Sequence, residues 1–260
     1  EAEACKDRLV GGGFPRERLS WFKAVKGVDQ RDWLVGNREK LSFRAEMEAD
    51  YTAVREAHSS MPGWGAVGCY LSHVALWQAA KVSAAGIIIF ERDAMPTHAD
   101  SYERVKKILG KVARARGGNP PDLCYFAGIA DYPMMQVEDV PEVGRLTGRV
   151  FCTHAYYVSP EGARKLLDDA FPMEVQVDSY MGYVINFYSD SPDTKKQVFA
   201  FMALDQPIGD VGIGTSTIQG KPIKDSVVFD KDNIWWFVPL LAILTLIIVA
   251  MVWKHLKHKG

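Results

Sequence analysis

Short apolar runs alternate along this chain with stretches that have helical spacing. Runs rich in β-branched and aromatic residues at 86–90, 123–128 and 150–158 predict three strands. The first run is apolar throughout, as is typical of a central strand covered on both faces. Between the first two runs, helical spacing predicts a helix over 102–115, carried by Val105, Ile108, Leu109 and Val112.

Two further helices flank these strands. One is expected over residues 70–80. The other follows the third strand, where Ser159, Pro160 and Glu161 supply an N-cap, a proline at the first helical position and an acid in the first turn. This alternation of strands and helices predicts an α/β domain with a mostly parallel sheet flanked by helices. Residues 205–233, rich in Gly, Asp, Ser and Thr, are expected to form loop and linker.

A long apolar run lies near the end of the sequence. Residues 234–253 carry no charge, and twenty helical residues span about 30 Å, the thickness of a hydrocarbon core. Trp235, Trp236 and Trp253 lie at its two ends, as expected at membrane interfaces. A buried core helix is the alternative, but core helices seldom run this long without a charge. We therefore expect a domain over 1–220, a linker over 221–233, a single transmembrane helix over 234–253 and a basic tail over 254–260.

The sequence allows two orientations of this single-pass anchor. Lys254, Lys257 and Lys259 follow the span, so the positive-inside rule favours a cytosolic tail with the domain on the far side. That arrangement needs a targeting signal, which would have to precede Glu1. A tail-anchored protein would instead hold the domain in the cytosol.

Net charge and cysteine content limit the kinds of partner and site that the sequence supports. The formal net charge is −1 and the first 230 residues contain no basic stripe, which argues against nucleic acid as a partner. The four cysteines are Cys5, Cys69, Cys124 and Cys152. They form no CxxC pair, which argues against a zinc site and against a dense disulfide framework, and leaves one long-range disulfide open.

An acidic pair follows the first strand, in the segment Glu91-Arg92-Asp93. Ligands of open α/β sheets bind beyond the carboxyl ends of the strands. Side chains two apart in extended backbone point the same way, so Glu91 and Asp93 could share a hard divalent cation. Such a cation can bridge a nucleotide diphosphate and neutralise it as a leaving group.

Four passages together resemble glycosyltransferase family 25, which includes lipooligosaccharide and procollagen galactosyltransferases and relatives in large DNA viruses. The similarity covers about residues 5–220. Its passages are Leu19–Gly27, Gly65–Gln78 (GAVGCYLSHVALWQ), the apolar strand ending in Glu91–Ala94, and Cys152–Leu167 (CTHAYYVSPEGARKLL) with Val177–Tyr180.

The resemblance implies a GT-A type, Rossmann-like fold, a UDP-sugar donor, Mn²⁺ and inversion at the anomeric carbon. It implies Glu91 and Asp93 as metal ligands, Ser72 and His73 near the nucleotide, and Asp178 as general base. The expected activity is transfer of a hexose, galactose or glucose, from UDP to a glycan or protein hydroxyl by a membrane-anchored enzyme.

Two departures favour a different reading. Arg92 replaces the middle acid of the family's metal motif, and the family's first strand is missing here or lies upstream. The alternative is a catalytically inactive transferase-like fold that serves as a structural, membrane-linked component of a viral particle (capsid) or another assembly. Single residues also have structural alternatives: His73 and His154 could be structural histidines, and Asp178 could cap a helix that starts at Ser179.

Overall fold

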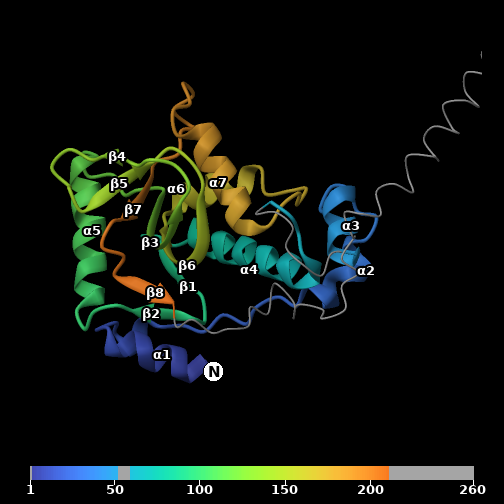
Figure 1. Ribbon diagram of the computed structural model, residues 1–260, viewed down its shortest axis with the longest axis horizontal. Helices are drawn as coiled ribbons and strands as arrows, with labels where there is room; N and C mark the ends of the chain where they lie inside the picture. The colour runs from blue at the N-terminus through green and yellow to red at the C-terminus, as the bar shows by residue number, and fades with distance from the viewer. Residues whose placement is uncertain (1, 52–58, 211–260) are drawn as a thin grey trace, which may run out of the picture. The chain divides into compact units, whose positions relative to one another are not determined.

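The computed structural model describes residues 2–51 and 59–210. Figure 1 shows their arrangement. The helices are α1 (Ala2–Gly11), α2 (Arg31–Leu34), α3 (Phe43–Tyr51), α4 (Gly63–Lys81), α5 (Ser101–Ala115), α6 (Pro160–Asp168) and α7 (Val177–Tyr188), with short 3-10 helices η1 (Arg16–Arg18) and η2 (Gly27–Gln30). The strands are β1 (Ile87–Phe90), β2 (Ala94–Pro96), β3 (Leu123–Ala130), β4 (Met135–Gln136), β5 (Val143–Leu146), β6 (Val150–Val158), β7 (Ala200–Ala203) and β8 (Ile208–Asp210).

The central sheet has six strands in the order β1-β6-β3-β7-β5-β4, and β2 pairs with β8 in a separate ribbon. Within the described residues, only β3 with β7 forms a parallel pair, and the other neighbours in the main sheet are antiparallel. The predicted α/β class, with helices flanking a sheet, is confirmed. The sheet is mixed rather than mostly parallel as expected, because β6 lies between β1 and β3 and runs opposite to both.

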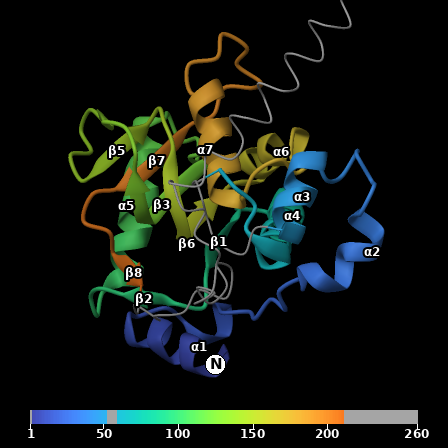
Figure 2. The ribbon, with the colours of Figure 1, turned by 45° about the vertical axis from the view of Figure 1, so that its right-hand side comes forward.

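Helices cover both faces of this sheet. Leu123 and Tyr125 of β3 pack in one core with α4, α6 and α7, whereas Cys124 and Phe126 pack in a second core with α1 and α5. This alternation follows from the two-residue period of a strand. Figures 1 and 2 show α5 on one side of the sheet and α4, α6 and α7 on the other. The described domain therefore has three layers, with both faces of β3 buried.

The predicted start of α6 is confirmed in detail. The Ser159 hydroxyl accepts a hydrogen bond from the Gly162 amide, and Pro160 is the first helical residue. Gly162 is required here, because an added Cβ would lie 2.1 Å from the carbonyl oxygen of Asp122. Behind this contact, Lys165 Nζ donates to Asp122 Oδ2 over 2.8 Å, and both side chains are buried.

Two expectations concern the last part of the chain, a loop from residue 205 and a membrane span. Residues 208–210 form β8, where the sequence suggested a loop, because they pair with β2. Across residues 2–51 and 59–210, no helix combines the length and apolar character needed to cross a membrane. The predicted span at 234–253, its linker and its basic tail lie outside the described residues.

Candidate functional site

The candidate site lies where β1 leaves the sheet and continues into β2. The amide of Glu91 still pairs with the carbonyl oxygen of His154 in β6 at 2.9 Å. Glu91 and Asp93 follow directly, so the acidic pair occupies the carboxyl end of a sheet strand, as the sequence predicts.

Both carboxylates converge on one histidine. His154 Nδ1 lies 3.3 Å from Asp93 Oδ1 and 3.6 Å from Glu91 Oε2. Hydrogen bonding to Asp93, then to Cys152 and Glu91, raises the pKa of His154 to about 12. His154 is therefore an imidazolium at neutral pH, and it compensates the two negative charges.

Glu91 has a second set of partners on its other oxygen. His73 Nε2 lies 3.6 Å from Glu91 Oε1, and the Thr153 hydroxyl donates to the same oxygen. Burial raises the pKa of Glu91, but the hydrogen bonds from His154, His73 and Thr153 outweigh burial and hold that pKa far below its usual range. Glu91 is therefore a carboxylate held between two histidines.

His73 is buried and fixed by aromatic neighbours. Its Nδ1 lies 2.7 Å from the Tyr156 hydroxyl, which also accepts a hydrogen bond from Trp77 Nε1 at 2.9 Å. The imidazole and Tyr156 rings stack with centroids 5.8 Å apart. These contacts orient the ring so that Nε2 faces Glu91, whichever tautomer is present.

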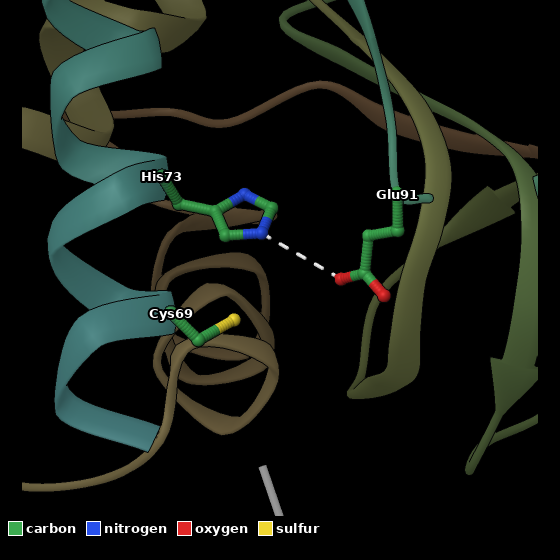
Figure 3. A group of neighbouring side chains, drawn as sticks. All are labelled: Cys69, His73 and Glu91. Atoms are coloured by element: carbon green, nitrogen blue, oxygen red, sulfur yellow. Dashed lines mark ion pairs between the residues drawn. The ribbon is translucent and has the colours of Figure 1, made fainter. Parts of the chain in front are cut away.

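Cys69 lies one turn before His73 on α4, and both side chains point toward Glu91 (Figure 3). Burial, followed by the negative charges of Glu91 and Asp178, raises the pKa of the Cys69 thiol. All four cysteines of the chain are free, so the long-range disulfide left open by the sequence does not form.

Asp178 lies in the first turn of α7 and is buried. Its Oδ1 accepts from the Ser179 amide at 2.7 Å, and its Oδ2 accepts from the Cys152 amide at 3.4 Å. The helix begins at Val177 with Gln176 as its N-cap, so the alternative of a helix starting at Ser179 and capped by Asp178 is wrong. The charge of Asp178 still reaches the cluster, since it contributes to the raised pKa of Cys69. Its role as a base stays a prediction.

Ser72 takes part in a packing contact rather than in the cluster around Glu91. Its hydroxyl donates to the Gly68 carbonyl at 2.7 Å and accepts from the Val25 amide at 2.9 Å. Gly68 allows this contact, because an added Cβ would lie 2.5 Å from the Val25 carbonyl and 2.6 Å from the Gly27 amide nitrogen. Gly68 and Ser72 thus hold the segment before η2 against α4. A nucleotide contact for Ser72 stays a prediction.

Thr153, His154 and Tyr156 are absent from the predicted site residues, and His154 was expected only as a possible structural histidine. Thr153 and His154 are adjacent, yet both reach Glu91, whereas neighbours in a regular strand face opposite ways. Cys152 just before them has a φ of 72°, and the register of β6 with β3 shifts in this region. Such irregularities turn side chains out of the regular alternation. The signal in the sequence was the passage Cys152–Leu167, which contains all three residues.

A cavity of about 290 Å³ lies along the other end of α7. Half of its lining residues are aromatic and two are carboxylates; the lining consists of Asp169, Phe171, Pro172, Glu174, Val175, Tyr180, Tyr183, Val184, Phe187 and Tyr188. Aromatic rings beside carboxylates suit the apolar faces and hydroxyls of a sugar.

A scan against protein-family models finds no match to this chain, and a search of curated proteins finds none either. The resemblance to glycosyltransferase family 25 therefore stays a prediction that rests on the sequence motifs.

Proposed function

We propose that this chain is a membrane-anchored glycosyltransferase that moves galactose or glucose from a UDP-sugar to a glycan or protein hydroxyl with inversion. The observation that carries the proposal is the convergence of Glu91 and Asp93 on the imidazole of His154 at the end of β1. The GT-A type topology, the UDP-sugar and the anchor at 234–253 belong to the proposal.

The residues around this position fit a hard divalent cation. Glu91, Asp93 and His154 each offer one ligand atom, and these atoms lie within 4.8 Å of one another. Two carboxylates and an imidazole are donors that Mn²⁺ accepts. Glu91 and Asp93 would hold the ion, with His154 as a third ligand once it has lost its proton. When bound, Mn²⁺ neutralises the departing UDP diphosphate.

The other residues have roles of their own in this proposal. Asp178 would take the proton of the acceptor hydroxyl, as an inverting transfer requires of a base on the acceptor side. His73 would hold Glu91 in place through Nε2 near the nucleotide, where Ser72 is also expected.

One observation favours the second candidate function, an inactive fold in a viral particle or another membrane-linked assembly. The imidazolium of His154 already compensates both carboxylates. A transferase site that had lost its metal would need such an internal cation. In that case the fold would act as a structural module and bind neither UDP nor Mn²⁺.

Release of UDP from UDP-galactose and UDP-glucose separates the two functions. The full-length chain in detergent with Mn²⁺ is expected to turn over one of these donors, and proton NMR should show inversion at the anomeric carbon. Asp93→Ala should abolish turnover, whereas Asp100→Ala, at an exposed acid paired with Arg104, should leave it unchanged. Arg92→Asp restores the acidic motif and should raise turnover. Full activity in Asp93→Ala would remove the metal assignment.

A further inference from the structure

We infer that Cys69, His73 and Glu91 form a zinc site of their own, next to the proposed Mn²⁺ position. Cys69 and His73 are four residues apart on α4, so they lie on the same face of the helix. Glu91 approaches from the end of β1, and the three ligand atoms lie within 4.8 Å of one another (Figure 3). The inference goes beyond the proposed sugar transfer and does not depend on it.

The spacing suits tetrahedral zinc. Bonds of about 2.0–2.1 Å to nitrogen and oxygen and about 2.3 Å to sulfur place neighbouring ligand atoms roughly 3.3–3.6 Å apart. His73 Nε2 and Glu91 Oε1 are 3.6 Å apart already. Rotation of the Cys69 side chain is the main adjustment that a bound ion would require.

The surroundings hold two of the ligands in place, as outer partners do in zinc sites. The Tyr156 oxygen has two lone pairs and can accept from both Trp77 Nε1 and His73 Nδ1. His73 then presents the lone pair of Nε2 to the metal. The Thr153 hydroxyl fixes Glu91 through one lone pair of Oε1 and leaves the other for the ion.

The chemistry of the three ligands distinguishes this site from its neighbour. A thiolate and an imidazole select zinc over manganese, whereas Glu91, Asp93 and His154 lack sulfur. Glu91 uses Oε1 toward His73 and Oε2 toward His154, so it would bridge the two ions when both are bound. Three protein ligands leave a fourth position for water or a small ligand.

Metal loading of the full-length chain tests the inference directly. Protein stripped with a chelator, loaded with Zn²⁺ and desalted should retain one zinc per chain by elemental mass spectrometry. Loading with Co²⁺ should give the near-ultraviolet charge-transfer band of a thiolate-bound ion, a readout that needs no variant. Absence of retained zinc, or absence of the thiolate band, overturns the inference.

Variants locate the ion. Cys69→Ser and His73→Gln should weaken zinc binding by at least about a hundredfold, beyond the loss typical of outer-shell partners. His98→Gln, at an exposed histidine, and Cys124→Ala, at a buried cysteine outside the cluster, should retain zinc. Undiminished zinc affinity in a folded Cys69→Ser protein overturns the assignment.

Asp93→Asn separates this inference from the proposed function. It should keep zinc and the cobalt band while losing Mn²⁺-dependent UDP binding, if the chain is a transferase. Retained zinc in a chain that never binds UDP would leave the zinc site standing and remove the transferase. Loss of zinc in Asp93→Asn would show that the two positions are one site, which contradicts the inference.

Discussion

Replacement of His154 by glutamine tests the electrostatics at the end of β1. The change removes the positive charge that lies 3.3 Å from Asp93 and 3.6 Å from Glu91 and keeps a side chain of similar length. Two carboxylates with ligand atoms no more than 4.8 Å apart repel each other by at least about 3.5 kcal/mol at an effective dielectric near 20. Glu91 and Asp93 are 24% and 27% exposed, so solvent screens part of this repulsion. We expect His154→Gln to lower the free energy of unfolding by about 2–3 kcal/mol at low salt.

The pH dependence of this loss has a definite sign. The pKa of His154 rises from 6.5 to about 12 on folding, so its stabilising contribution is complete below pH 6.5 and falls as the pH rises toward 12. The difference between wild type and His154→Gln should therefore be larger at pH 6 than at pH 9.

Urea unfolding in EDTA at pH 6 and pH 9, followed by circular dichroism, measures the difference. His98→Gln, at an exposed histidine, serves as the matched control and should behave as wild type. Equal stability of His154→Gln and wild type, or a difference that grows with pH, would refute the ion-pair reasoning.

Three further substitutions test the packing around the site, each by urea unfolding. Gly68→Ala should lower the free energy of unfolding by about 1–3 kcal/mol, because its Cβ would lie 2.5 Å from the Val25 carbonyl. The control is Gly110→Ala in α5, whose Cβ meets nothing closer than 3.6 Å and which should be neutral or slightly stabilising. Equal effects of the two substitutions would contradict the close approach at Gly68. Lys165→Met should cost about 3–5 kcal/mol, because it removes a cation partner from a buried carboxylate, and a loss below about 1 kcal/mol would show that the pair is not needed. Tyr125→Phe should be neutral or stabilising by about 1 kcal/mol, because the buried Tyr125 hydroxyl has no hydrogen-bond partner among the described residues, and a clear loss of stability would reveal a partner.

Local signals in the sequence were sufficient for much of the fold. The strand at 86–90, the helix at 102–115 and the Ser159-Pro160 start of α6 depend on neighbouring residues alone, and these three elements are confirmed. The expected central position of the first strand is wrong, because β1 lies at the edge of the sheet beside β6. Strand order depends instead on pairing between distant segments, which local patterns do not record. The insertion of β6 between β1 and β3 could therefore not be derived. β4, with two residues, is too short to show a pattern.

Part of the candidate site could also be predicted from the sequence. Glu91 and Asp93 follow a recognisable strand, and the structure brings His73 against Glu91, whereas Asp93 contacts His154. The place of Thr153 and His154 depends on the irregular backbone at Cys152, whose φ of 72° no side-chain pattern announces. The sequence predicted no metal site at Cys69, because Cys69 belongs to no CxxC pair. Its neighbours in the structure are a histidine on the same helix and a glutamate at the end of a strand.

Binding of UDP in the presence and absence of Mn²⁺ tests the central claim most directly. At a hundredfold excess over its dissociation constant, UDP should stabilise the full-length chain by about 2.7 kcal/mol, seen as a rise in the melting temperature that requires Mn²⁺ and disappears in Asp93→Ala. An unchanged melting temperature with both ligands present, or a rise that Asp93→Ala retains, would contradict a nucleotide-sugar site at Glu91 and Asp93.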